Sequence, residues 1–380
     1  MKENFIGYLR KTDDELKALW NDALISFDAN VLLNLYRYSN ETRKQIIKLL
    51  DKFSTRIFLT HQAGLEFHRN RFEVISDQEK VYKEFFSTIQ KLDNELNSKS
   101  KHPFLSYSLQ AKLNETLNDV KEDILSSEKY YRDLLQKDDI YSEIEKSFIS
   151  KMDSEYPDET LNLLYEEGKK RFQNKIPPGY ADEKDKESHR KYGDYILWKQ
   201  LIDHAKKEQK SVLFITDEKK EDWWWKLKNG RTIGPRQELV EEFKKETAMD
   251  FHLYSTDKFI EYGLSFFNET NPKAVLEVKV AGEERVREIE QHFRRKERLD
   301  KLKEALNEED IVRLKQELEL IDSIDILHHK KRNLLTELLL LERKVELTEG
   351  DLRSHNEIHN LIAEIDNEIE QSKARLHNRD

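Results

Sequence analysis

The sequence predicts an α/β fold in which a mainly parallel β-sheet is flanked by helices. Short apolar runs, typical of strands buried on both faces, occur at Leu24–Phe27, Arg56–Thr60 and Ser211–Thr216. Long segments with helical spacing separate these runs, as crossovers between parallel strands require. A fourth run, Asp250–Tyr254, alternates apolar and polar side chains and is expected to be the last strand.

Helices are expected between and around these strands. A short helix over Glu15–Trp20 leads into the first strand, and helices over Val31–Arg37 and Thr42–Lys52 follow it. The segment Tyr192-Gly193-Asp194 opens a helix that precedes the third strand. Because proline is favoured at the first position of a helix, Gly234-Pro235 predicts a further helix start after a turn at Asn229-Gly230-Arg231.

Two regions lack strand signals. Between about residues 75 and 175, apolar residues recur at helical spacing among charged ones, which predicts a helical insertion: a lid over substrate, or a scaffold or dimer arm. Residues 273–380 predict a C-terminal helical or coiled-coil region, with one short strand left open at Val275–Val280. Its pattern is interrupted at Asn307, Asp322-Ser323 and Glu349-Gly350-Asp351, so several helices fold back on one another. The first domain therefore spans residues 1–272.

Composition narrows the class of protein. The 380 residues include no cysteine, which excludes disulfides, thiol chemistry and cysteine-based zinc sites. The formal net charge of -10 argues against indiscriminate nucleic-acid binding but permits local basic patches. The sequence holds no apolar run of signal-peptide or membrane-spanning type, so we expect a cytoplasmic protein with no membrane partner.

Asp28 marks the most informative position, because it follows the first strand directly and precedes a helix. Ligands bind open α/β sheets at the carboxyl ends of their strands, where this carboxylate is expected to lie. The alternative is that Asp28 only caps the following helix, which aspartate does well. The residue alone does not decide between these two roles.

Three further carboxylates are expected at the same edge of the sheet. Asp217 follows the third strand, and Glu66 lies within two turns of the end of the second. Asp194 begins a helix that runs antiparallel to the strand after it, so this helix also starts at that edge. Four close carboxylates would repel one another unless cations were bound between them. The sequence thus predicts Mg²⁺ or Mn²⁺ as cofactor, in a two-ion arrangement that activates water and stabilises a leaving oxygen.

These residues carry a resemblance to a known family. The chain resembles PIN-like nuclease domains, and more narrowly the large bacterial PIN-like branch with a helical insertion, over about Phe5 to Phe267. The motifs that carry the resemblance are Phe27–Tyr36, Glu66, Tyr192–Trp198, Phe214–Asp217, Pro177–Tyr180, Glu221–Trp224 and Gly234–Leu239. Each motif is weak alone, but their order together is fairly specific.

The resemblance implies metal-dependent hydrolysis of phosphodiester bonds, more often in RNA than in DNA. The family's acids fall on Asp28, Glu66, Asp194 and Asp217, which are implied to be both catalytic and metal-binding. The family's setting suggests bacterial defence, and the C-terminal helices lie outside the resemblance. Self-association or a protein partner is the expected use of the helical regions.

Residues near the four acids have candidate supporting roles. Asn30 and Thr216 could orient ligands or waters, or bond only to local turn backbone. Arg236, Arg231 and Arg69 could contact phosphate, against the alternatives of solvent exposure or, for Arg236, an ion pair with Glu238. Of Trp223–Trp225, which could stack bases, at least two are expected to pack in the core.

Other functions are less well supported. The chain lacks the glycine-rich first turn of dinucleotide-binding domains, Walker-type phosphate loops, and the second aspartate that a haloacid-dehalogenase-like enzyme needs, where Asn30 stands. Two alternatives stay open. One is a structure-specific DNase, and the other is a non-catalytic scaffold whose helices bind a partner.

Overall fold

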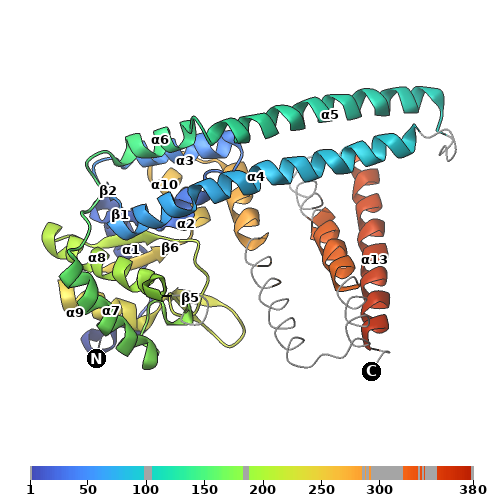
Figure 1. Cartoon of the computed structure of the whole chain (residues 1–380). Coiled ribbons are helices and arrows are strands. Elements are labelled where there is room, and N and C mark those ends of the chain that lie inside the picture. The colour runs from blue at the N-terminus through green and yellow to red at the C-terminus, as the bar shows by residue number, and fades with distance from the viewer. Residues whose placement is uncertain are drawn as a thin grey trace, which may run out of the picture. The chain divides into compact units, whose positions relative to one another are not determined.

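The computed structural model contains a four-stranded sheet in which every pair of neighbouring strands is parallel. The structure describes residues 2–97, 105–182, 188–284, 287, 291, 320–332, 334, 335, 338 and 349–377. The strands are β1 (Leu24–Phe27), β2 (Ile57–Phe58), β3 (Val212–Ile215) and β6 (Phe251–Tyr254), in the order β2-β1-β3-β6. The predicted α/β fold with a parallel sheet is confirmed (Figure 1).

Helices cover both faces of this sheet because its strands are apolar on both sides. They are α1 (Asp13–Asp22), α2 (Ala29–Asn34), α3 (Asn40–Lys52), α8 (Gly193–Glu208), α9 (Gln237–Thr247) and α10 (Thr256–Phe266), and the N-terminal η1 (Lys2–Tyr8) packs against α9. Phe27 packs against Phe259 on one face, with ring centroids 5.3 Å apart. On the other face Trp198 packs against Phe251 at 4.9 Å, so each face has its own aromatic core.

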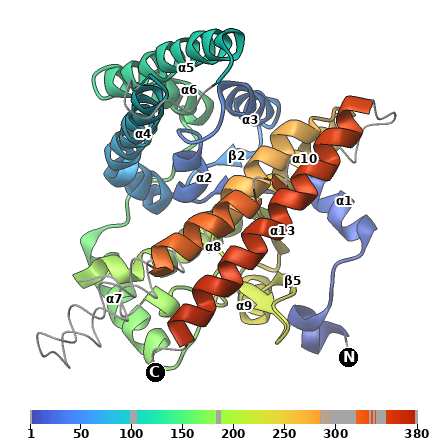
Figure 2. The same cartoon turned by 90° about the vertical axis from the view of Figure 1, so that its right-hand side faces the viewer.

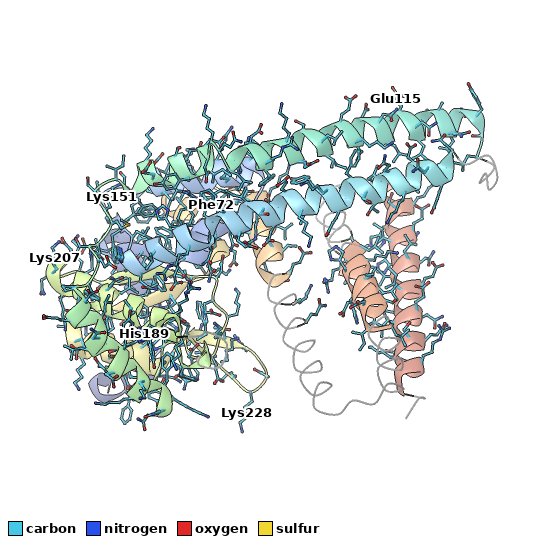
Figure 3. The ribbon with its side chains drawn as sticks, in the orientation of Figure 1. Phe72, Glu115, Lys151, His189, Lys207 and Lys228 are labelled. Carbon is cyan, nitrogen blue, oxygen red and sulfur yellow. The ribbon has the colours of Figure 1, made fainter. Side chains whose placement is uncertain are left out.

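The region between β2 and β3 is helical, as its composition predicts. It contains α4 (His61–Leu96), α5 (Tyr107–Leu134), α6 (Asp139–Phe148), α7 (Asp158–Gln173), η2 (Tyr180–Asp182) and η3 (Ser188–Tyr192). Helices α4 and α5 lie side by side and extend beyond the sheet as a two-helix arm (Figure 1). Within the arm Tyr82 stacks on Tyr131 with centroids 5.4 Å apart. Phe72 lies where α4 leaves the sheet, whereas Glu115 lies toward the far end of α5 (Figure 3).

A two-stranded antiparallel hairpin, β4 (Trp224–Lys226) and β5 (Thr232–Pro235), follows β3. Its turn contains Asn229–Arg231, as predicted. The prediction that Gly234-Pro235 starts a helix is wrong, because Pro235 pairs with Trp224 at the end of β5 and α9 begins at Gln237. Proline is tolerated there because a two-stranded ribbon leaves its outer edge without a required N–H donor.

The chain divides into two compact units, Met1–Glu288 and Ile289–Asp380. The short strand left open at Val275–Val280 does not form, since residues 272–284 are helical and Glu277 accepts hydrogen bonds from Ser39 and Thr42.

In the second unit residues 320–332 form a continuous helix, so the prediction of an interruption at Asp322-Ser323 is wrong. Helix α13 (Glu349–His377) begins where the last interruption was predicted, and Asn307 lies outside the described residues. Helix α13 lies beside the helix of residues 320–332 (Figure 2). Ile365 and Ile369 of α13 pack against Ile324.

Candidate active site

Asp28 lies at the carboxyl end of β1, at the start of α2. Its backbone is extended, with φ -70° and ψ 151°, and its side chain makes no capping hydrogen bond to that helix. Instead, Oδ2 accepts a hydrogen bond of 2.8 Å from Thr216 Oγ1 and one of 3.4 Å from Asn30 Nδ2. The capping role weighed for Asp28 therefore does not apply to its carboxylate, which is held above the sheet.

The environment of Asp28 disfavours its negative charge. Burial, together with the nearby carboxylates of Glu66 and Glu218, raises the pKa of this carboxyl from 3.8 to about 6, although the hydrogen bonds from Thr216 and Asn30 lower it. Glu66 therefore lies close enough to Asp28 to oppose its ionisation. Such a charge conflict is typical of carboxylates that share a cation.

Glu66 projects from the second turn of α4 against the start of α8. Gln62 Nε2 donates a hydrogen bond of 2.7 Å to Glu66 Oε1. A Cβ atom added at Gly193 would lie 2.5 Å from the same oxygen, which is closer than the two atoms can approach. The glycine before Asp194 thus leaves room for Glu66, and α4 and α8 bring these two acidic positions together.

Asp194 and Asp217 each accept a hydrogen bond from a side chain of another segment of the chain. Trp223 Nε1 lies 3.4 Å from Asp194 Oδ2. Asp217 follows β3, where Asn34 Nδ2 donates a 2.6 Å bond to its Oδ2 and the backbone N–H of Thr256 donates a 3.2 Å bond to its Oδ1. Asn34 is itself buried, so its amide is fixed in the core beneath the acid.

The four predicted acids lie at one edge of the sheet but do not form a closed cage. In the part of the chain that the structure describes, no three His, Asp or Glu side chains are close enough to hold a metal ion. The same residues include no ion pair from Asp28, Glu66 or Asp217 to a lysine or arginine. The available ligands are carboxylate oxygens with neutral amide and hydroxyl neighbours. Mg²⁺ and Mn²⁺ prefer oxygen ligands of this kind.

Glu218, Asn34 and Gln62 were missed by the sequence reasoning. Glu218 follows Asp217 directly, and the backbone N–H groups of Lys219 and Lys220 donate to its Oε1 at 2.7 and 3.1 Å. Its place after a strand was the signal that could have identified it. Asn34 and Gln62 carried no such signal, because polar residues inside helices are common.

A buried aspartate holds the loop that faces Asp194. Asp222 Oδ2 accepts a 2.9 Å bond from Gly179 N and a 3.3 Å bond from Ala181 N. Gly179 has φ +96°, a conformation that favours glycine, and a Cβ there would lie 3.1 Å from the Cβ of Asp194. The Pro-Pro-Gly-Tyr segment is thereby fixed against the start of α8.

The remaining candidates are three arginines and the two residues that contact Asp28. Arg236 pairs with Glu238 at 2.9 Å, the alternative weighed for it, and its Nη1 donates to Glu221 O. Arg231 is exposed in the β4–β5 hairpin. Arg69 lines a cavity of about 200 Å³ that Gly193 also borders. Asn30 and Thr216 both contact Asp28, as described above.

The tryptophan cluster divides as expected. Trp223 is buried in the core. Trp224 is partly buried and packs against the same core. Trp225 is partly buried and makes an edge contact with Tyr8, with centroids 6.0 Å apart. One indole of the three therefore packs outside the core.

Comparison with known proteins gives one match. A family model described as a PIN like domain matches residues 24–239, which is more than half of the chain and includes all four acids. No curated protein and no solved structure matches the chain. Across the described residues, the helices are all too short or too polar to cross a membrane.

Proposed function

The chain belongs to the PIN-like domain family, and from this premise we propose that it is a metal-dependent nuclease that hydrolyses phosphodiester bonds in RNA. One observation carries the proposal: the carboxylate of Glu66 lies near enough to Asp28 to oppose its ionisation at the carboxyl edge of the sheet. Neither forms an ion pair with Lys or Arg within the described residues, so their charge is left for a bound cation.

Each acid has a role in this proposal. Asp28 and Glu66 would hold Mg²⁺ or Mn²⁺, and Asp194 and Asp217 would complete the site when substrate is bound. Such ions supply an activated water and stabilise the leaving oxygen. Thr216 and Asn30 orient Asp28, while Asn34 and the N–H of Thr256 orient Asp217.

The test combines two acid variants with a matched control. Asp28→Asn and Asp217→Asn should abolish Mn²⁺-dependent cleavage of labelled single-stranded RNA without loss of fold. Asp22→Asn is the control, because Asp22 is an exposed aspartate that precedes β1 at the opposite edge and pairs with surface Lys210. Cleavage by Asp28→Asn at the wild-type rate would refute the assignment.

The same assay separates the alternatives. Single-stranded DNA and flap DNA are compared with RNA under titration with a chelator, and preferred cleavage of the flap would identify a structure-specific DNase. The open arrangement of the acids favours a second candidate, a non-catalytic scaffold that binds a partner through its helices. Absence of any metal-dependent cleavage together with partner capture by the two-helix arm would support that candidate.

A further inference from the structure

A second feature of the first unit is a basic and aromatic cavity beyond β6, the strand at the end of the sheet. This cavity of about 840 Å³ is bordered by the segment before α1, the β4–β5 hairpin, β6 and the start of α10. Six cationic side chains and two carboxylates line it, an excess of four positive charges in a chain whose net charge is -10. The cationic residues are Arg10, Lys11, Lys219, Lys226, Lys244 and Lys258.

The cations of this cavity are not fully neutralised. Lys11 and Lys244 share one carboxylate, Asp250, at 3.5 and 3.0 Å. Lys258 pairs at 2.6 Å with Glu261, but this pair is about half exposed and therefore contributes little. A polyanion could draw on these lysines at small cost, as phosphate backbones do with surface cations.

Aromatic side chains line the same cavity as these lysines. Trp225 is partly buried, and Tyr262 is 42% exposed with Tyr254 edge-on to it at 5.4 Å. Trp224 is fixed by a 2.6 Å hydrogen bond from its Nε1 to Glu218 O. Aromatic faces interleaved with cations are typical of sites where unpaired bases stack while lysines hold the phosphates.

The cavity lies next to the candidate active site. Lys219, in its wall, follows Asp217 by two residues. Ser255, also in its wall, precedes Thr256, whose N–H donates to Asp217 Oδ1 at 3.2 Å. β3 lies between β1 and β6, so β6, which borders the cavity, is two strand spacings, or about 10 Å, from the strand that ends at Asp28.

We infer that this cavity binds unpaired nucleotides adjacent to the scissile phosphate, so that the protein selects single-stranded nucleic acid. The inference rests on the proposed nuclease function. The bases of a duplex are stacked on one another, and their faces are not free to contact Trp225 or Tyr262. A cavity of this volume falls in the range of about 300–1,000 Å³ that accommodates small ligands, which suits a few nucleotides.

The experiment measures binding separately from cleavage. The Asp28→Asn variant, with chelator present, is titrated into a labelled short single-stranded RNA and its duplex, and anisotropy is recorded. Adding Trp225→Ala should weaken single-strand binding about fivefold or more, since one stacked base contributes that much. Trp225→Phe should restore most of the affinity because it keeps an aromatic face.

Two lysine variants, one inside the cavity and one outside it, test the electrostatic contribution to binding. Lys258→Gln should lower the slope of log affinity against log salt by about 0.7. Lys207→Gln removes a charge near the end of α8 that is more exposed than that of Lys258, 76% against 46%, and should change nothing. Figure 3 shows Lys207 on the opposite side of the first unit from Lys228, which lies in the turn of the β4–β5 hairpin.

The outcomes separate the two proposals. Unchanged binding by a folded Trp225→Ala variant, or equal affinity for duplex and single strand, would overturn the inference. If no protein cleaves RNA but binding depends on Trp225, the inference holds and the nuclease function fails. If the wild type cleaves RNA and Trp225→Ala keeps the wild-type KM, the nuclease function holds and the inference fails.

Discussion

Replacing Asp28 by Asn should stabilise the first unit at neutral pH, although it removes a residue of the candidate active site. In the folded chain burial, with Glu66 beside it, raises the pKa of Asp28 from 3.8 to about 6. The native state therefore binds more protons than the unfolded state between these values. By linkage, the free energy of unfolding falls as pH rises through this window and is level above it.

The size of the effect follows from the same shift. A difference of one pKa unit corresponds to about 1.36 kcal/mol, so the ionised carboxylate costs at most about 3 kcal/mol above pH 6. Asp28 is only partly buried, so we expect about 1–3 kcal/mol. An amide at this position carries no charge and can still accept the hydrogen bond from Thr216. The variant should match the wild type near pH 4 and exceed it above pH 6.

Urea unfolding with chelator present measures this difference. All five tryptophans lie in the first unit, so their fluorescence reports that unit and not the C-terminal one. Asp22→Asn is the control and should show no such pH dependence. Saturating Mn²⁺ should remove the advantage of the variant, because an ion that binds only the native wild type stabilises it. A variant no more stable than wild type at neutral pH, or an advantage independent of pH, would refute the reasoning.

Three further predictions concern the neighbours of the acids and the C-terminal unit. Gly193→Ala should displace Glu66, whose Oε1 the new methyl group would approach to 2.5 Å, and lower the cleavage rate about 100-fold with unchanged circular dichroism; wild-type activity would contradict this. Asn34→Ala should remove the 2.6 Å bond to Asp217, costing about 1–2 kcal/mol in urea unfolding and slowing cleavage; unaffected cleavage would exclude Asp217 from the site. Deleting residues 289–380 should leave tryptophan emission unchanged and abolish self-association, whereas a persistent dimer would assign assembly to the first unit.

The sheet could be predicted from the sequence because its strands are short, apolar and separated by long crossovers. Every residue of β1 and β3 is buried. A short, mostly apolar run such as Leu24–Phe27 is typical of a strand that is covered on both faces. Pro235 was misassigned because a helix start and an edge strand both tolerate proline. Residues 272–284 form a helix despite the β-branched side chains in Val275–Val280, because packing against α3 decides what local propensity does not.

The positions of the acids could be predicted, but not their partners. That Asp28 and Asp217 share an edge follows from strand direction alone. That Asn34 holds Asp217, or that Gly193 leaves space for Glu66, depends on side chains meeting across elements. Such meetings depend on helix rotation and tilt, which periodicity does not specify. The same holds for Arg171, which is buried and pairs with Glu242 of another helix at 2.7 Å.

That last pair helps to distinguish a catalytic from a structural use of the acids. Where the fold needs a carboxylate only for structure, as at Glu242, it supplies a guanidinium that makes two hydrogen bonds and neutralises the charge. At Asp28, Glu66 and Asp217 the donors are instead a hydroxyl, amides and a backbone N–H, which orient oxygen atoms but leave their charge. A scaffold would gain nothing from this uncompensated charge; burial of Asp28 and the Glu66 carboxylate beside it raise the pKa of Asp28. A site that exchanges divalent cations requires it, because a lysine or arginine in the same place would compete with the ion.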